Sequence, residues 1–398
     1  MLFNLIEPHL AWLESNGLGF LRLIGDPDYI HFRALMAVIL SFTLVVLFGR
    51  RTIRVLIAMK IRDNPEFYRA DVNQLMSDKN AVPTMGGILI AGAILTSTLL
   101  LADLGSFYVH MALLCLLWLA MLGGVDDYLK LIGAQRQPGS RDGLFMHEKL
   151  LFQFGLAVVL GLFIHNHGIN NDELGRQMAF SLNLPLLKTW DFNEQLGGFE
   201  ASRSLILLPS LAFVLITVLV IAGSSNAVNL TDGMDGLAAG IMAICAFAFT
   251  GLALIAGQES LAKQMLIPYI PKSSELAIVA GAMAGSCVGF LWFNCHPASV
   301  FMGDTGSLPL GGLLGYIAVV TRQEFLLLVI GGIFVLEALS VVLQIGYYKF
   351  TGGKRIFRCA PIHYHFHLGG WTEQQVVVRF WLITAILAAI AVATLNLR

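Results

Sequence analysis

Charged side chains are scarce in this chain. Asp, Glu, Lys and Arg make up 13% of its 398 residues, while 57% are hydrophobic, and the mean hydropathy is +0.74. A soluble domain is usually about one quarter charged, so the composition excludes an ordinary soluble protein and indicates a chain divided into membrane spans. The net charge of -1 provides no basic field, and we expect no nucleic-acid partner.

Cysteine is also rare. The five cysteines, at positions 115, 245, 287, 295 and 359, are odd in number, scattered and mostly within apolar runs. This pattern matches neither a disulfide framework nor a zinc site, so we interpret them as packing residues. The first residues, MLFNLIEPHLAWLE, lack the basic region and cleavage site of a secretory signal. We expect residues 1–32 to form an N-terminal interfacial segment.

Long apolar runs are what the chain has in abundance. A bilayer-spanning helix needs about 20 largely apolar residues. Ten segments are predicted as spans, at roughly 33–50, 86–101, 108–125, 150–165, 205–222, 237–256, 276–293, 308–321, 325–348 and 376–396. The sequence therefore predicts an all-α polytopic membrane protein. Residues 1–398 form a single membrane domain, in which residues 33–398 are a bundle of about ten helices.

The distribution of Lys and Arg predicts the orientation of the bundle. Basic residues concentrate in the connectors 51–85, 126–149 and 349–375 and are fewer on the opposite side, so we expect these connectors in the cytoplasm and both termini outside. With ten spans, connectors 223–236 and 294–307 also face the cytoplasm. The polar motifs PTMGG, DDYLK, NAVNLTDGMDG, FNCHPASVFMGDTGS and APIHYHFH all fall in these five connectors. The sequence thus predicts one site on the cytoplasmic face.

Acidic residues form the first part of this predicted site. Asp126 and Asp127 are neighbours on a helix and point about 100° apart, so we expect one to face a metal or phosphate and the other a different partner. The alternative is a solvated pair at the membrane edge. Lys130, one turn later, can neutralise an acid or bind phosphate. Asp304 lies in a Gly-flanked turn, where it either has a functional role or caps the next span.

The motif NAVNLTDGMDG repeats a polar residue at every third position. Asn226, Asn229, Asp232 and Asp235 would form one stripe if the segment is helical. Carboxylate and amide oxygens suit Mg²⁺, and Asn amides suit a base or sugar. The alternative is an ordinary Asn/Asp/Gly turn. Gly233 allows close approach of a backbone.

Histidine and intramembrane polar residues complete the pattern. The alternation of His363, His365 and His367 suits one face of an extended segment. Because hard oxygen ligands elsewhere favour Mg²⁺ over zinc, we interpret these residues as hydrogen-bond donors near phosphates. Glu337 lies inside a predicted span and is a functional candidate unless it simply bonds to a neighbouring helix. Phe301 either stacks on a base or packs at the membrane interface.

Together these features indicate chemistry at a membrane surface. Mg²⁺ bound by carboxylates typically also holds substrate phosphates, and an apolar bundle can admit a lipid tail. The combination favours phosphoryl transfer between a soluble nucleotide and a membrane lipid. A secondary transporter is the alternative from another class, but transporters bind near the midplane and often have repeated halves. No convincing repeat is present here.

From about residue 33 to the C-terminus, the motifs resemble those of the phospho-N-acetylmuramoyl-pentapeptide-transferase family, within the polyprenyl-phosphate N-acetylhexosamine-1-phosphate transferases. The resemblance implies a Mg²⁺-dependent enzyme of peptidoglycan synthesis in the bacterial inner membrane. Its substrates would be UDP-MurNAc-pentapeptide and undecaprenyl phosphate, and its products lipid I and UMP. DDYLK is shared with sister enzymes that use UDP-N-acetylglucosamine, which is the alternative donor. PTMGG and the His-rich stretch point to the first family.

The resemblance also implies roles for individual residues. Asp304 matches the metal ligand, and Asp126 and Asp127 match paired acids that are further possible ligands, one of them the base on the lipid phosphate. His363 is the fourth residue predicted to be catalytic. The residues predicted to bind substrate are Lys79, Lys130, Lys149, Asn226, Asn229, Asp232, Gly233, Asp235, Asn294, Phe301, Gln344 and His365.

One departure from the family affects these roles. The family usually has three consecutive His, an aromatic residue and Glu, whereas Tyr364 replaces the middle His here and His367 replaces the Glu. We therefore assign no catalytic role to Tyr364. The transfer is either direct or proceeds through an aspartyl-phosphate intermediate. A homodimer is expected, as for many inner-membrane enzymes.

Overall fold

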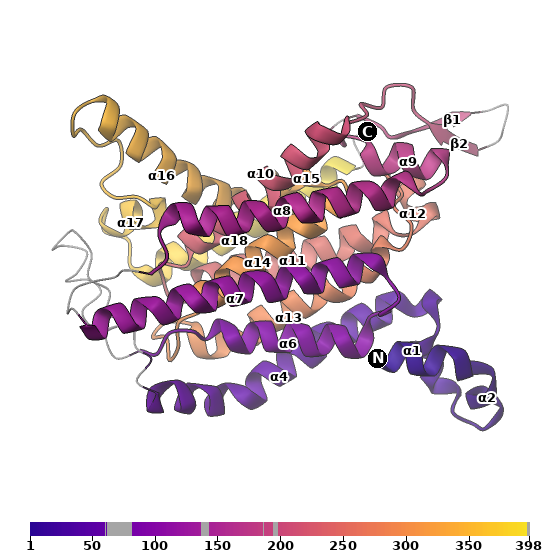
Figure 1. The fold of residues 1–398 in the computed structure, drawn as a ribbon, viewed down its shortest axis with the longest axis horizontal. Coiled ribbons are helices and arrows are strands. Elements are labelled where there is room, and N and C mark those ends of the chain that lie inside the picture. Colours follow the sequence, from indigo (N-terminus) through magenta and orange to yellow (C-terminus); the bar gives the residue numbers. More distant parts are fainter. Residues whose placement is uncertain (60, 62–81, 137–142, 186, 194–197, 396–398) are drawn as a thin grey trace.

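The computed structural model describes the chain except residues 60, 62–81, 137–142, 186, 194–197 and 396–398 (Figure 1). Ten longer helices run along its length: α4 (Ile30–Ala58), α6 (Gly87–Leu101), α7 (Phe107–Arg136), α8 (Met146–Ile169), α10 (Ser210–Thr231), α11 (Leu237–Ala256), α13 (Leu276–Asn294), α14 (Asp304–Val320), α16 (Gly332–Phe350) and α18 (Glu373–Thr394). The shorter α-helices in the described part of the chain are α1 (Leu2–Ile6), α2 (Leu10–Ser15), α3 (Arg22–Gly25), α9 (Glu173–Phe180), α12 (Glu259–Gln264), α15 (Glu324–Ile330) and α17 (Ile362–His367).

The helices confirm the predicted fold class. Within the described ranges, eight helices are long and apolar enough to cross a membrane, and α6 and α14 are shorter apolar helices. The protein is therefore an all-α polytopic membrane protein, while the count of ten crossings stays a prediction. One predicted span differs from its observed form. Residues 325–348 are divided between α15 and α16 at Gly331, the residue that ends the first helix and begins the second.

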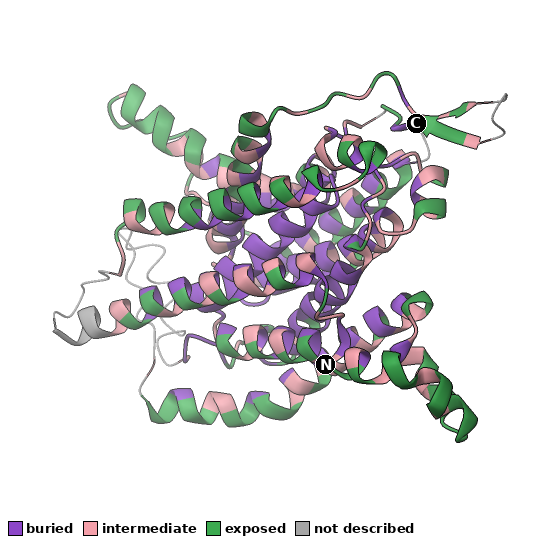
Figure 2. Cartoon of the chain, turned by 45° about the vertical axis from the view of Figure 1, so that its right-hand side comes forward, coloured by how far each residue is buried: buried purple, intermediate pink, exposed green. Residues whose placement is uncertain are grey.

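Helix α14 lies in the middle of the bundle, and every one of its residues is buried. Figure 2 shows the same buried centre, with exposed faces on the outer helices. Small residues allow its neighbours to approach closely. A Cβ on Gly87 of α6 would lie 2.0 Å from the backbone nitrogen of Gly306, and one on Gly311 would lie 2.4 Å from the carbonyl oxygen of Ser224 in α10. Such close backbone contact is how helices associate in lipid.

A buried ion pair fixes one end of the bundle. Arg33 of α4 donates to Glu275 over 2.7 Å, and the other oxygen of Glu275 accepts the backbone N–H of Asp103 over 2.8 Å. The aromatic ring of Phe3 lies 4.0 Å from the Arg33 guanidinium carbon. The N-terminal helices are thereby attached to α4 and to the end of α6. Helix α4 begins at Ile30, within the predicted segment 1–32, and the membrane-interface location of that segment stays a prediction.

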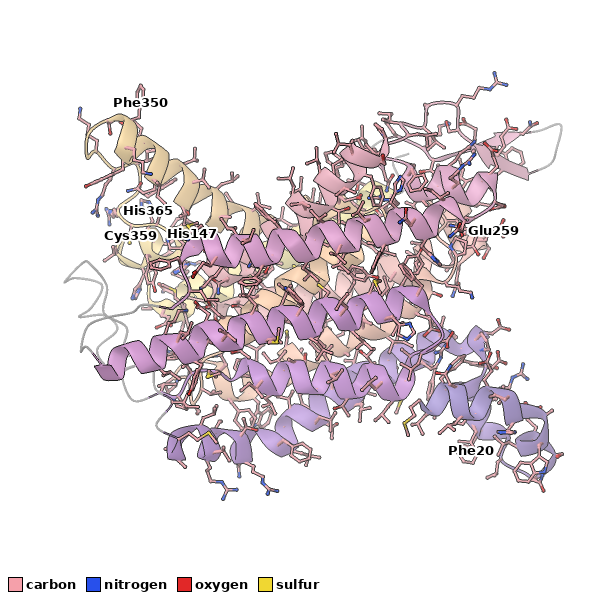
Figure 3. The ribbon with its side chains drawn as sticks, viewed as in Figure 1. Phe20, His147, Glu259, Phe350, Cys359 and His365 are labelled. Carbon is pink, nitrogen blue, oxygen red and sulfur yellow. The ribbon has the colours of Figure 1, made fainter. Side chains whose placement is uncertain are left out.

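A short hairpin lies at this end as well. Strands β1 (Trp190–Asn193) and β2 (Gly198–Ala201) pair antiparallel, with Trp190 opposite Ala201. Figure 3 shows Phe20 and Glu259 at the same end, whereas His147, Cys359 and His365 lie at the other. The polar motifs of the sequence gather at that other end, which we call the motif end.

Candidate active site

A cluster of carboxylates and lysines forms the centre of the motif end. Lys149, near the start of α8, contacts Oδ2 of Asp126 at 2.6 Å and Oδ2 of Asp304 at 2.7 Å. Lys130 of α7 contacts the same two oxygens at 2.7 and 3.2 Å. Asp126 and Asp304 therefore share two ammonium groups, although they lie on different helices. Lys130 and Lys149 thus contact Asp126 and Asp304, two of the acids that the sequence predicted to be catalytic.

Asp127 has a different environment from its neighbour. Its Oδ1 accepts the backbone N–H of Asp304 over 3.2 Å. Its Oδ2 accepts the backbone N–H of Thr305 over 2.9 Å and the Thr305 hydroxyl over 2.7 Å. Asp127 thus caps the first turn of α14 from another helix, where a negative charge also interacts favourably with the helix dipole. The closest contacts of the two adjacent acids thus differ, although Lys130 also lies 3.9 Å from Oδ1 of Asp127, and their separate roles stay a prediction.

The backbone before α14 makes this capping possible. Gly303 has a φ of 71°, a left-handed conformation that glycine adopts without steric cost. A Cβ at this position would lie 2.7 Å from Oδ2 of Asp127. On the α7 side, a Cβ on Gly123 would lie 2.1 Å from the carbonyl oxygen of Asp304. Both glycines allow α7 to contact the start of α14 directly.

The predicted polar stripe continues only to the end of α10. Asn229 donates through Nδ2 to Oδ1 of Asp304 over 2.7 Å and to the Ser307 hydroxyl over 2.9 Å. The helix ends at Thr231, so Asp232 and Asp235 lie in the following turn and not on the same helical face. The cause is the run of turn residues TDGMDG. The helical stripe therefore describes Asn226 and Asn229, and the turn describes Asp232 and Asp235.

Asp232 is half-buried beside this cluster. Burial, followed by the negative charges of Asp304 and Asp127, raises the pKa of Asp232 to about 7. A hydrogen bond from the backbone of Gly303 acts in the opposite direction. Any cation that enters beside Asp304 would favour the ionised form of this carboxyl.

Asp235 belongs to a second cluster near the start of α11. Its Oδ2 lies 3.1 Å from Nδ1 of His296, and its backbone N–H donates to Glu373 over 2.8 Å. Next to it, Asn294 accepts the backbone N–H of Gly236 over 3.1 Å and donates to the carbonyl of Val300 over 2.8 Å. Asn294 thus connects the turn before α11 to the loop that carries Phe301.

The PTMGG segment is attached to that same loop. The backbone N–H of Phe301 donates to the carbonyl of Pro83 over 2.8 Å, and its carbonyl accepts the N–H of Gly86 over 2.9 Å. The Phe301 side chain is partly exposed at the motif end. All five motifs of the sequence therefore meet in the described part of this end. Lys79, which was predicted to bind substrate, lies outside the described residues.

The His-rich stretch differs from its predicted form. Residues 362–367 are the helix α17 rather than an extended segment, so His363 and His365 point in different directions. The physical reason is that Pro361 stands at the N-cap, after which the chain is free to turn helically. His363 is fully buried and lies beside Gly233, where a Cβ would be 2.5 Å from its Nε2. Tyr364, to which the sequence assigned no role, donates to the carbonyl of Gly233 over 3.1 Å.

Three predicted substrate-binding residues bond elsewhere. Asn226 donates to Gln153 over 2.6 Å, one turn away from Asn229. Gln344 accepts the backbone N–H of Phe357 over 2.9 Å, and His365 accepts that of Arg358 over 3.1 Å. Gln344 and His365 hold the loop before α17. Their predicted contacts with substrate stay predictions.

Sequence reasoning overlooked Thr305, His296 and Glu373 as parts of the site. Thr305 was recognisable only as a possible helix cap, because the acid that it contacts lies far away in the chain. His296 and Glu373 carried no spacing signal, since they are joined to Asp235 only by the fold.

The donor set suits a hard divalent metal ion. Ligand oxygens of Asp126, Asp127 and Asp304 all lie within 4.8 Å of one another. These three carboxylates face two lysines, which leaves one formal negative charge before Asp232 is included. The oxygens of all three carboxylates already have partners, but those of Asp127 accept from the backbone of α14, whereas Oδ2 of Asp126 and Oδ2 of Asp304 face only lysine side chains, which makes these two oxygens the more available ligands. Oxygen ligands of this kind are preferred by Mg²⁺.

Comparison with known proteins gives a consistent result. Residues 109–322 match the family described as Glycosyl transferase family 4. A phospho-N-acetylmuramoyl-pentapeptide-transferase of Desulfotalea psychrophila is 42% identical, and the match covers 100% of both chains. Proteins with the same name from Citrifermentans bemidjiense and Leptospira biflexa are 43% and 40% identical, the first over 100% of both chains and the second over 96% of this chain and 98% of its own length.

Proposed function

The chain belongs to the phospho-N-acetylmuramoyl-pentapeptide-transferase family, and from this premise we propose that it transfers phospho-MurNAc-pentapeptide from UDP-MurNAc-pentapeptide to undecaprenyl phosphate. The products are lipid I and UMP. The observation that carries the proposal is the pair of ammonium groups that Asp126 and Asp304 share. Two lysines beside a metal-binding set of carboxylates suit a reaction in which both substrates bring phosphates.

The nucleotide donor would bind between the carboxylate cluster and the loop that carries Phe301. The aromatic ring can stack on uracil, while Asn294 holds the loop in place. Mg²⁺ held by Asp304 and Asp126 would supply positive charge for the phosphates, as in other phosphoryl-transfer sites. Lys130 and Lys149 would then bind phosphoryl oxygens as point charges.

An apolar cavity gives the lipid acceptor a place to bind. The cavity has a volume of about 430 Å³ and lies between α10, α14, α15 and α16. Its walls include Leu219, Ala227, Phe334, Val335 and Leu339. On α10 its lining extends to Ala227, two residues before Asn229 but on a different face of the helix. We propose that a polyprenyl chain in this cavity extends beyond Ala227, around α10, to place its phosphate at the lysines.

The reaction is proposed as a direct transfer. An oxygen of the lipid phosphate attacks the phosphorus attached to the sugar, and the bond from that phosphorus to the oxygen of UMP breaks. The remaining proton of the lipid phosphate passes to a carboxylate. We favour Asp126 over Asp127 for this role, because Oδ2 of Asp126 contacts only lysine side chains that would also bind the phosphate, whereas both oxygens of Asp127 accept hydrogen bonds from α14. The second pKa of a phosphate is about 6, so a weak base suffices.

Two experiments test the proposed reaction. Membranes that contain the protein are offered UDP-MurNAc-pentapeptide or UDP-N-acetylglucosamine with undecaprenyl phosphate, and the lipid-linked product is identified by mass. Product from the first donor is expected, while product only from the second would establish the sister activity.

Incubation with the first donor without lipid tests whether the transfer is direct, because a phospho-sugar covalently attached to an Asp would refute direct transfer.

The setting of the reaction follows from the same proposal. The protein is a multi-pass membrane protein, and we propose the bacterial plasma membrane as its location, with the motif end in the cytoplasm where the nucleotide is available. The basic connectors support this orientation. A homodimer stays a prediction, to be tested by the mass of the protein in detergent.

A further inference from the structure

A carboxylate and an imidazole are paired inside the apolar part of the protein, next to the proposed site. Glu337 of α16 and His363 of α17 both have 0% exposed surface. Oε2 of Glu337 lies 3.1 Å from Nδ1 of His363, and the backbone N–H of His363 is 3.5 Å from the same oxygen. Burial of a carboxylate in apolar surroundings is costly unless a partner compensates for it. We therefore expect the Glu337–His363 pair to have a functional role.

The geometry leaves one ring nitrogen of His363 for another partner. A ring nitrogen facing a carboxylate carries its proton toward that carboxylate, so Nδ1 is the nitrogen expected to bear hydrogen. Among the residues that the structure describes, Nε2 of His363 has no hydrogen-bond partner, although it is buried. It lies where a Cβ of Gly233 would be, at 2.5 Å. This nitrogen therefore faces the turn that follows α10.

We propose that Glu337 is a positioning residue for His363, and this inference rests on the proposed function. Its carboxylate holds the ring in the Nδ1–H form, so that the buried Nε2 packs against Gly233 and fixes the turn that carries Asp232 beside the carboxylate cluster. Glu337 acts only through His363 and does not touch the substrate.

The neighbouring Tyr364 supports this assignment. Its hydroxyl donates to the carbonyl of Gly233 over 3.1 Å, so α17 is attached to the turn on the same side as the imidazole. The position of the ring relative to the turn is thus fixed by a second contact. The carboxylate of Glu337 has then only to select which nitrogen bears the proton.

Kinetics of single and double variants test whether Glu337 works through His363. Glu337→Leu is expected to lower kcat by about 10- to 100-fold, the loss typical when a residue that orients another is removed. His363→Gln is expected to lower it at least as much. The double variant should be no slower than His363→Gln, because residues that act as a unit are not additive. Losses that multiply would overturn the proposal.

Two control variants separate positioning from folding. Glu337→Gln keeps the size of the side chain and an acceptor oxygen, so its kcat should lie between those of wild type and Glu337→Leu. Glu275→Gln removes another buried carboxylate, which is paired with Arg33 at the opposite end of the bundle. It should lower thermal stability without a change in kcat. A loss of kcat in Glu275→Gln equal to that in Glu337→Leu would indicate a general folding effect and overturn the proposal.

A spectroscopic measurement needs no substrate. The chain has ten histidines, and the ¹⁵N signals of labelled imidazoles distinguish protonated Nδ1 from protonated Nε2. His363→Gln identifies the signal of His363 by its loss. In Glu337→Leu this signal should change from the Nδ1–H pattern toward the Nε2–H pattern, and an unchanged pattern would overturn the proposal. This result is independent of turnover. An inactive wild type would refute the proposed function, and the spectrum would still test whether Glu337 sets the protonated nitrogen of His363.

Discussion

Asn in place of Asp127 should weaken the fold rather than remove the base. The substitution keeps one acceptor oxygen and replaces the other by an amide that faces the N–H of either Asp304 or Thr305. Losing one hydrogen bond to a charged group costs about 1.5–3 kcal/mol. Losing the negative charge at the start of α14 costs about 0.3–1 kcal/mol more. The expected decrease in stability is therefore about 2–4 kcal/mol.

Asp126→Asn provides the matched comparison. Its side chain can still accept the N–H of Leu144, which Asp126 accepts over 2.7 Å, but it loses the charge that faces two lysines. We expect a smaller change in stability and the larger loss of kcat per folded molecule. The apparent Tm in detergent is measured by tryptophan fluorescence at one fixed scan rate, because membrane proteins often unfold irreversibly. UMP release is measured at a temperature well below the apparent Tm. Equal Tm values for Asp127→Asn and wild type would refute the assignment of Asp127 as a cap.

Three further predictions concern neighbouring positions. Gly123→Ala should lower stability by about 1–3 kcal/mol through overpacking, because its Cβ would lie 2.1 Å from the carbonyl oxygen of Asp304. Gly124→Ala should be tolerated in the same thermal assay, because the atom nearest to its Cβ would be 3.8 Å away. Lys149→Met should lower kcat by at least about 100-fold in UMP release. Lys263→Met, which breaks a pair with Glu259 and a contact with the Trp190 ring at the opposite end of the bundle, should not. Burial raises the pKa of Asp232 to about 7, so the folded state binds the proton more tightly than the unfolded chain. The stability of wild type should therefore fall relative to that of Asp232→Asn as the pH rises from about 4 through 7. Parallel curves of Tm against pH for the two proteins would contradict this.

The fold class followed from composition and from the lengths of apolar runs. These signals are local, and each predicted span coincides with a helix, although α15 and α16 divide one of them. The break at Gly331 was not predicted, because a single glycine inside an apolar run does not require a helix to end. The helical form of residues 362–367 was missed for a related reason. Alternating histidines are compatible with a strand, whereas here Pro361 at the N-cap and the contacts with Glu337 and Gly233 accompany a helix.

The members of the site were easier to predict than their individual contacts. The parity of the spans placed all five motifs at one end, and the structure brings their described residues together. The helical angle predicts that Asp126 and Asp127 point in different directions, but the partner that each contacts depends on how α7, α8 and α14 cross. The cluster of Asp235, His296 and Glu373 joins three distant parts of the chain. No spacing in the sequence records such a contact.

The most direct test of the central claim is UMP release by purified protein in detergent. The assay contains UDP-MurNAc-pentapeptide and undecaprenyl phosphate, with and without Mg²⁺, and compares wild type with Asp304→Asn. The account predicts release that requires both Mg²⁺ and the lipid, and loss of this release in a variant that remains folded. Unchanged release by Asp304→Asn, or no release by folded wild type with Mg²⁺ present, would contradict it.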